Sequence, residues 1–442
     1  MFLSDLNERL WNGPMLIILL VTHIFLTFKT GFVQVKTATA LKLLFFPNSK
    51  TLNKSNDTGS IGKGTLHTLT TTLAATLGTG NIVGISTAVA LGGPGAVFWC
   101  WLTGLLGMAT TYSECYLGSL FKHKKVDGSY ISGPMCSLKY GLNANVLAVI
   151  YAACALFAAL GMGCSTQAYT LTESVRVHFD IPPYIIGIIT AAITGIIING
   201  GAKGVHKFCF RLIPALSIFY ILACFVIMGF NYGNNLNALV LIISSAFKAK
   251  AVCAGVAGGG LMLAARYGIS RGLFSNEAGL GTASFVTADS STTPEKQALI
   301  SMSATFFDTI IMCTITGIVI VGTMLSCPAL FTDTTPTELT TIAFSRIPYI
   351  GTFLLSFSLV AFALATLIGW SYFAEKAADF LLGQKGILIC RFLYILTIFT
   401  GSVMSLDLVW ELADFANALL AIPNVLALFF LRKHIRPYSA SL

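Results

Sequence analysis

Three glycines and an asparagine interrupt an apolar run of this chain where a membrane-spanning helix would be most regular. The stretch, residues 74–84, reads AATLGTGNIVG. In hydrocarbon every backbone N–H and C=O needs a partner, so a non-helical break at membrane depth persists only where protein or a polar cavity surrounds it. The flanking helix ends offer free N–H groups and free carbonyls, which bind a zwitterion and a cation without buried charged side chains. The break therefore predicts the binding site of a transporter of small polar solutes.

The composition is that of an all-α polytopic membrane protein. Of 442 residues, 55% are hydrophobic and 10% are charged, and the mean hydropathy is +0.80, whereas about 25% of the residues of soluble domains are charged. Apolar stretches of about 20 residues, enough to span a bilayer as a helix, occur near 13–32, 66–91, 95–120, 144–169, 182–200, 210–230, 243–268, 299–326, 350–374, 386–405 and 408–431. These continuous runs predict eleven transmembrane helices and exclude the alternating strands of a barrel.

The basic residues are concentrated on one side of the predicted spans. The net charge is +9, and twenty-two of the 27 Lys and Arg residues fall after odd-numbered spans or in the C-terminal segment. The other side holds Arg9, Arg176, Lys248, Lys250 and Arg346. The positive-inside rule then predicts an outer N-terminus and a cytoplasmic C-terminus in the cell (plasma) inner membrane. The basic excess reflects topology, so we expect no nucleic acid partner.

A second interruption is predicted in span 7. An outer helical portion is expected from about Leu241 to Ala257, a break at Gly258-Gly259-Gly260, and an inner portion from Leu261 to Tyr267. Spans 2–6 and 7–11 then each open with a broken helix, and they enter from opposite sides. This is the pattern of a 5+5 inverted repeat with a site at the midplane and one extra N-terminal helix. We expect a single transport domain in three parts. Residues 1–64 hold the N-terminal helix and a cytoplasmic amphipathic connector, 65–230 form the first inverted repeat and 231–442 form the second.

Polar side chains inside other spans are candidates for the walls of the site. Gln167 in span 4 needs hydrogen-bond partners in the membrane, and Thr366 and Trp370 in span 9 share one helical face. The alternatives are interhelical hydrogen bonding for Gln167 and a core or lipid-facing position for Trp370. For the first break the alternative is close helix packing at Gly80 and Gly84.

Two acids, Glu114 and Asp308, are expected near the inner ends of spans 3 and 8. Acids in membrane spans are functional by default, yet these two can also cap helices or pair with Lys or Arg. We treat them as gating candidates. The polar stretch 270–282 is expected on the cytoplasmic side as a structured gate or re-entrant loop, with a solvated connector as the alternative.

No motif of a catalytic or transition-metal site is found in the sequence. The eleven cysteines are scattered without C-x-x-C spacing, and no H-E-x-x-H motif or paired midplane carboxylates occur. We expect no enzyme and no cofactor.

Two long motifs closely resemble the alanine/glycine:cation symporter family. The first is LGTGN at residues 77–81 followed by GGPGAVFW at 92–99, and the second is RGLFSNEAGLG at 271–281. The similarity covers nearly the whole chain. It implies a leucine-transporter type fold with one extra N-terminal helix. It also implies transport of alanine or glycine together with Na⁺; in some members the coupling ion is H⁺ or the substrate is glutamine.

The resemblance also implies site residues. The amides of Thr79 and Gly80 would receive the substrate carboxylate, and Asn81 would orient it or line a cation site. Gln167 and Trp370 would line the pocket, and Gly258, Gly259 and Gly260 would supply carbonyls to the ammonium. Sodium would lie among the carbonyls of Ala74, Leu77 and Phe362 and the hydroxyl of Thr366. Family members often carry hydroxyl residues at two adjacent positions of this helix. In this chain the first of the two is Ala365, so only Thr366 has a hydroxyl.

These features together predict a secondary active symporter that imports a small neutral amino acid with Na⁺. The alternatives are an H⁺-coupled or glutamine-preferring transporter of the same fold and an uncoupled uniporter or channel. The expected partners are the amino acid, Na⁺ and the lipid bilayer. The sequence leaves stereochemical preference, stoichiometry and oligomeric state open.

Overall fold

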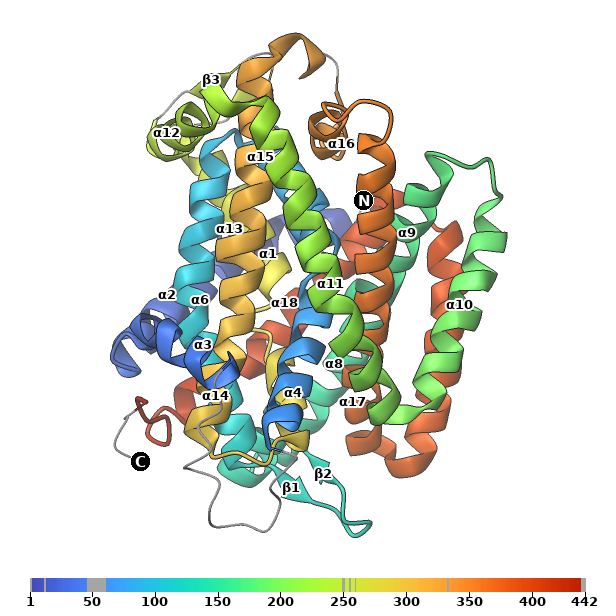
Figure 1. Cartoon of the computed structure of the whole chain (residues 1–442). Helices are drawn as coiled ribbons and strands as arrows, with labels where there is room; N and C mark the ends of the chain where they lie inside the picture. The colour runs from blue at the N-terminus through green and yellow to red at the C-terminus, as the bar shows by residue number, and fades with distance from the viewer. Residues whose placement is uncertain are drawn as a thin grey trace.

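The structure, a computed structural model, consists of packed helices with two short hairpins (Figure 1). It describes residues 2–11, 13–45, 61–248, 251–253, 256–258, 260–331 and 334–438. The elements of the first half are α1 (Phe2–Trp11), α2 (Pro14–Lys29), η1 (Val33–Lys36), α3 (Thr37–Phe45), α4 (Ile61–Thr76), η3 (Thr79–Asn81), α5 (Val83–Gly92), α6 (Gly95–Leu120), β1 (His123–Lys124), β2 (Tyr130–Ile131), α7 (Pro134–Cys136), η4 (Ser137–Gly141), α8 (Asn145–Leu160), η5 (Gly161–Ser165), α9 (Thr166–Arg176), α10 (Pro183–Asn199) and α11 (Gly201–Phe230).

The second half begins with a short helix and a hairpin before the next long helix. Its elements are η6 (Tyr232–Asn234), α12 (Asn235–Ser245), β3 (Ala251–Cys253), β4 (Val256–Gly258), α13 (Leu261–Asn276), η7 (Thr282–Asp289), α14 (Pro294–Thr305), η8 (Phe306–Cys313), α15 (Thr314–Ser326), η9 (Pro328–Phe331), α16 (Leu339–Phe344), α17 (Gly351–Val403) and α18 (Leu406–Phe430). The segments η4, η5 and η8 are π-helical, and the other η elements are 3₁₀ turns.

The helices confirm the fold class of a polytopic helical membrane protein. Among the described residues, six helical stretches are long and apolar enough to cross a membrane, or seven if the bent pair 66–76 and 79–92 counts as one span. The 53-residue α17 is longer than one span needs and turns at Gly383, where φ is +65°. The count of eleven spans and the inverted repeat remain predictions.

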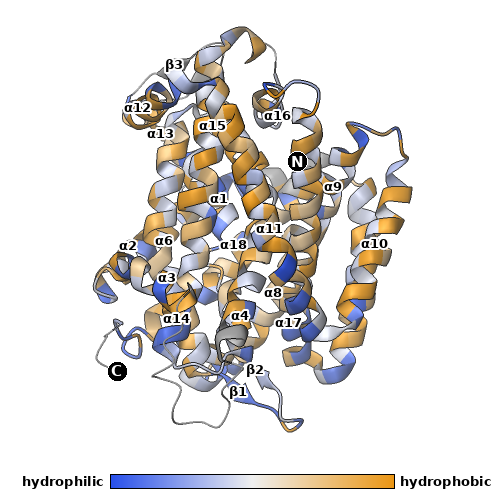
Figure 2. Ribbon diagram, in the orientation of Figure 1, coloured by the Kyte–Doolittle hydropathy of each residue, from blue (hydrophilic) through white to orange (hydrophobic). Residues whose placement is uncertain are grey.

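The outer faces of the helices are apolar. Figure 2 shows hydrophobic residues along α10, α11 and α15 and hydrophilic ones near the ends of the bundle. On α10, Ile188 and Ile196 are more than half exposed, and on α11 Ile218 and Leu222 are as well. An exposed apolar surface of this extent fits contact with lipid.

Two ends of the molecule are distinguished by their short elements. We call the end with α12, α16 and the β3–β4 hairpin the α12 face, and the end with the β1–β2 hairpin and the C-terminal segment the β1–β2 face (Figure 1). The core between them is formed by α6 against α13 and α14, and by α17 against α4, α9 and α10.

The predicted bounds of span 7 are wrong. The helix before the three glycines, α12, ends at Ser245, and Gly258 closes a β-hairpin by pairing with Ala251. The helix that follows, α13, begins only at Leu261. The glycines precede this helix and do not interrupt one. The prediction was wrong because the apolar residues on either side of the hairpin gave one continuous hydropathy signal.

The corrected helix also moves the residues that follow it. Arg266 and Arg271 lie within α13, which starts at the α12 face, and not in a cytoplasmic connection. Residues 272–288 are buried and form the end of α13, a break and η7. A solvated connector at residues 270–282, the alternative kept above, is therefore wrong, and the gate on the cytoplasmic side stays a prediction.

Candidate substrate and cation site

The first break lies where the sequence predicts it. Helix α4 ends at Thr76, Gly78 has extended backbone angles (φ −136°, ψ −147°), and η3 forms one 3₁₀ turn before α5 starts at Val83. The two helical halves are bent by 57°. Because the first N–H groups of a helical segment have no intrahelical acceptor, the amides of Thr79 and Gly80 are suited to bind an anion.

Close packing explains Gly80, and polar contacts explain Asn81. A Cβ on Gly80 would lie 3.1 Å from the Cα of Ser275 on α13, so the two broken segments meet backbone to backbone. The Oδ1 of Asn81 accepts the N–H of Gly78 over 3.1 Å and closes the turn. The small-residue interpretation thus holds for Gly80, whereas Gly84 has open space beside it.

Gln167 faces the first break from α9. Its Oε1 lies 3.5 Å from the position that a Cβ on Gly78 would take. This oxygen and the hydroxyl of Thr79 are buried without a hydrogen-bond partner in the described part of the chain. Buried polar atoms without partners are costly, so their presence beside free amides fits a site for a polar ligand.

Helix α17 brings Thr366 to the same place. Its hydroxyl lies 3.5 Å from the carbonyl oxygen of Leu77. One turn later, a Cβ on Gly369 would lie 3.1 Å from the carbonyl carbon of Ala74, so the α17 and α4 backbones are in contact. These oxygens suit a hard cation such as Na⁺.

The remaining predicted residues of the cation site are buried on α17. Phe362 is 1% exposed and lies one turn before Thr366, and Ala365 is fully buried. The structure thus brings Ala74, Leu77 and Thr366 together, with Thr366 supplying the one side-chain oxygen of this predicted set.

Trp370 lies between the π-helical segment η5 and the second broken helix. A Cβ on Gly163 would collide with its indole ring, so this glycine makes room for the ring. The indole Nε1–H donates to Oε1 of Glu277 over 2.9 Å. Trp370 is therefore a buried contact between two elements of the site and not a lipid-facing residue.

The second break follows α13 and not Gly258. Glu277 has left-handed backbone angles (φ +56°), and Gly279 and Gly281 also have positive φ. The chain therefore cannot continue as a helix between Asn276 and Thr282. Gly258 lies in the hairpin beside α5, and Gly259 lies outside the described residues, so the structure does not bring Gly258 to the break.

Glu114 holds this second break. One carboxylate oxygen, Oε1, accepts the N–H groups of Gly279 (2.9 Å) and Gly281 (3.1 Å) and the amide of Asn424 on α18 (2.7 Å). The hydroxyl of Tyr151 donates to the Leu280 carbonyl over 2.8 Å. Backbone groups freed by the break are thus satisfied by side chains of three other helices, as burial requires.

Asp308 does not lie near the end of its span. It is in η8, near the middle of the Pro294–Ser326 helix, and its carboxylate contacts Asn81 and Ser275. The predicted position of span 8 began five residues late, and the π-helical segment also turns this residue toward the first break. The gating role of Glu114 and Asp308 stays a prediction.

The site is covered toward the α12 face. The hydroxyl of Thr340 on α16 donates to the carbonyl of Ile82 over 3.2 Å. Ser86 on α5 donates to the carbonyl of Pro336 over 2.8 Å. The segment around α16 therefore lies over α5, the half of the first broken helix that faces the α12 face.

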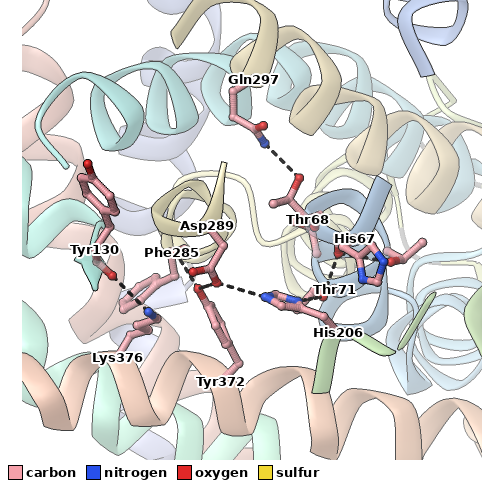
Figure 3. A network of polar contacts seen from close by, with 12 residues as sticks. His67, Thr68, Thr71, Tyr130, His206, Phe285, Asp289, Gln297, Tyr372 and Lys376 are labelled. Carbon is pink, nitrogen blue, oxygen red and sulfur yellow. Dashed lines mark hydrogen bonds and ion pairs between the residues drawn. The ribbon is translucent and has the colours of Figure 1, made fainter. Parts of the chain in front are cut away.

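A polar network closes the site toward the β1–β2 face (Figure 3). The Nδ1 of His206 on α11 is 2.6 Å from the hydroxyl of Thr71 on α4, and its Nε2 is 3.0 Å from Oδ2 of Asp289. Tyr372 on α17 donates to the same Asp289 oxygen over 2.6 Å. The network joins α4, which precedes the first break, and η7, which follows the second break, to α11 and α17.

The family model of the sodium:alanine symporter family matches residues 1–439. The chain belongs to this family. It is 40% identical over 434 residues to a sodium/alanine symporter, AgcS, of Methanococcus maripaludis, covering 97% of this chain and 94% of the relative. A protein of Bacillus subtilis named a probable sodium/glutamine symporter is 31% identical over 97% of this chain and 87% of its own length.

The structural comparison agrees on the fold. The solved structure of MhsT in complex with L-phenylalanine superposes with a TM-score of 0.59 at 15% identity, covering 83% of this chain and 88% of MhsT. The fold class and the family predicted from the two motifs are thereby confirmed.

Sequence reasoning missed Ser275, Glu277 and Asn424. The first two lie in the motif at 271–281, where glycines stand close to an amide, Asn276, as they do in the first break. That pattern was the signal for the second break. Asn424 had no such signal, since it is an isolated amide in the apolar second half of α18.

Proposed function

We propose that the chain is a secondary active symporter that imports alanine or glycine with Na⁺ by alternating access. The observation that carries the proposal is the first break, beside which the oxygens of Gln167 and Thr79 are buried without a hydrogen-bond partner among the described residues. The break is covered on both faces by contacts that join separate elements. A ligand in such a site is exchanged across the membrane when the contacts toward one face open while those toward the other face stay closed.

The substrate would be held by its two charged ends. Its carboxylate would bind the amides of Thr79 and Gly80, and its ammonium would bind Gln167 Oε1 and the last carbonyls of α13, which carry the negative end of that helix dipole. The rings of Trp370 and Phe274 border this space. They would leave room for a hydrogen or methyl side chain, which favours glycine and alanine over glutamine.

Sodium would bind between α4 and α17. The Thr366 hydroxyl and the carbonyls of Leu77, Ala74 and Phe362 form the proposed ligand set, and the geometry of the first two fits it. The ion would hold α17 against the first broken helix and so stabilise the arrangement that binds substrate.

The orientation in the membrane follows from charge. The β1–β2 hairpin, the start of α11 and the C-terminal segment carry eight Lys and Arg residues: Lys124, Lys125, Lys203, Lys207, Arg211, Arg432, Lys433 and Arg436. The positive-inside rule then places the β1–β2 face in the cytoplasm and the α12 face outside, with the N-terminus outside.

The experiment is uptake of labelled alanine, glycine and glutamine into proteoliposomes. Uptake is measured under an inward Na⁺ gradient and, separately, under an inward H⁺ gradient without Na⁺. Concentrative alanine uptake with Na⁺ alone is expected. Uptake driven only by H⁺, or flux that never exceeds equilibrium, would overturn the proposal in favour of a proton-coupled carrier or a uniporter.

Substitutions assign the site. Thr366→Ala and Asn81→Ala are expected to abolish gradient-driven uptake, while Thr366→Ser keeps the hydroxyl and should retain it. Normal uptake by both alanine variants would refute the assignment.

A further inference from the structure

A groove lies between α10 and α11, on the outer surface of the bundle and near the β1–β2 face (Figure 1). Its volume is about 440 Å³. Ile196 and Ile197 line it from the end of α10, and Phe208 and Leu212 line it from α11. Ile196 is 76% exposed, so the groove opens toward the lipid.

Glycines form the corner beside this groove. Helix α10 ends at Asn199 and α11 begins at Gly201, whose φ is +61°, so a glycine turn joins the two helices. A Cβ on Gly204 would lie 2.8 Å from the carbonyl oxygen of Ile197, so the helices are in close contact here. Gly200 and Gly204 line the groove and have no side chains to fill it. The groove is therefore built into the packing of the two helices.

Two cations line the groove without an acidic partner. Lys207 and Arg211 are one turn apart on α11, and both are exposed. Among the residues that the structure describes, no carboxylate forms an ion pair with either of them. Arg391, whose guanidinium lies near the same glycine turn, is by contrast paired with Glu375 over 2.6 Å. The positive charge in the groove is thus left for a ligand to neutralise.

Arg211 lies at membrane depth. Helix α11 has 30 residues, so its length is about 45 Å, the full thickness of a bilayer with its headgroups. Arg211 follows the first residue of the helix, Gly201, by about 15 Å along the axis. One headgroup layer is only about 5–8 Å thick. A cation at this depth is unfavourable unless its long side chain reaches back toward the headgroups and finds an anion there.

We propose that the groove binds an anionic glycerophospholipid of the leaflet at the β1–β2 face. Its phosphate would lie between Lys207 and Arg211, and an acyl chain would lie along Ile196 and Leu212. A guanidinium binds phosphate through two parallel hydrogen bonds, and an ammonium adds a compact positive charge. Basic pockets between transmembrane helices at the cytoplasmic side suit such headgroups. A zwitterionic headgroup brings its own cation and complements the groove less well.

The lipid site adjoins the network that closes the β1–β2 face. His206, the residue before Lys207, contacts Thr71 on α4 and Asp289. The groove is present in the arrangement in which this network is formed. A lipid that binds the groove therefore stabilises the closed β1–β2 face relative to an open one.

Lipid binding is measured by native mass spectrometry of the detergent-purified protein. Phosphatidylglycerol and phosphatidylcholine with the same acyl chains are added separately, and tighter binding of phosphatidylglycerol is expected. The double variant Lys207→Gln/Arg211→Gln removes both charges. At about fivefold for each cation, its affinity for phosphatidylglycerol should fall by roughly 25-fold. The two single variants should each lose about fivefold, so the test holds if the double variant fails to fold.

Lys124→Gln is the matched control. Lys124 is an exposed cation on the β1–β2 hairpin, away from the groove, and its loss should leave the affinity for phosphatidylglycerol unchanged. Equal binding of the two lipids, or an equal loss of affinity in Lys124→Gln, would overturn the site. Thermal stabilisation by inorganic phosphate as large as that by phosphatidylglycerol would show that the groove takes a free anion and would overturn the lipid assignment.

Hydrogen exchange tests the link to closure. The backbone amides of residues 66–76 on α4 do not line the groove, yet this segment is held by His206. In nanodiscs they should exchange more slowly with phosphatidylglycerol than with phosphatidylcholine alone, and the difference should vanish in the double variant. Equal exchange in the two lipids would refute the link to closure. Neither measurement involves transport, so the lipid site and the proposed function are tested separately.

Discussion

Replacing Trp370 by phenylalanine removes one hydrogen-bond donor from the second break and leaves the ring packing largely in place. The indole N–H donates to the buried carboxylate of Glu277 over 2.9 Å. A hydrogen bond to a charged group contributes about 1.5–3 kcal/mol. At about 1.4 kcal/mol for each factor of ten, its loss changes an equilibrium by roughly 10- to 150-fold.

The affected equilibrium is closure of the site. Trp370 belongs to α17 and Glu277 to the break after α13, so the bond exists only when these elements are packed together. Trp370→Phe should therefore favour a more open arrangement and raise the Kd for alanine by roughly 10- to 150-fold. The measurement is equilibrium binding of labelled alanine to the purified protein at saturating Na⁺.

Trp101 offers a matched control. Its indole N–H is buried on α6 but has no hydrogen-bond partner in the described part of the chain. Trp101→Phe should leave the Kd unchanged within about twofold. Thr282→Val removes the other donor to Glu277, at 2.7 Å, and should raise the Kd as well. An unchanged Kd in Trp370→Phe would refute the conclusion that this bond holds the site closed.

Three other contacts are each tested by substitution. Gly163→Ala would push a methyl group into the Trp370 ring and should destabilise the protein by about 1–3 kcal/mol, seen as a lower melting temperature, whereas Gly84→Ala meets nothing within 4 Å and should not. Glu114→Leu leaves the N–H groups of the second break without an acceptor, which costs about 1–3 kcal/mol for each group, and should abolish uptake. Glu114→Gln keeps Oε1 and should retain uptake. Loss of uptake in both variants, or in neither, would contradict the role given to that oxygen. His206→Gln breaks the network at the β1–β2 face and should raise efflux of alanine from loaded proteoliposomes in the absence of Na⁺; unchanged efflux would show that the network does not hold this face closed.

The first break could be predicted from sequence because its signal is local. Gly78 and Gly80 in an apolar run break the helical pattern, and hydrocarbon leaves no other way to satisfy the freed backbone than a polar site. Thr366 and Trp370 were found by the same kind of local argument, since their spacing of four residues puts them on one face of a helix.

The second break shows where local signals mislead. Three consecutive glycines at 258–260 are a stronger interruption than the sequence from Asn276 to Gly281, yet the structure places Gly258 in a strand of a hairpin and Gly260 directly before α13. Glycine lowers the cost of leaving the helix but does not say at what depth the chain does so. Depth is set by which helices pack around the segment, here through Glu114, Tyr151 and Asn424.

The sequence by itself determined the membrane class, the family and the position of the first break, because hydropathy, glycine placement and long motifs are properties of contiguous residues. Only the tertiary structure decided that Asn81 meets Ser275 and Asp308, residues separated from it by 194 and 227 positions. The physical reason is that a buried polar group is satisfied by whatever neighbour the packing supplies, and that neighbour lies on another helix. The partners of such a group are therefore fixed by the arrangement of the helices and cannot be found along the chain.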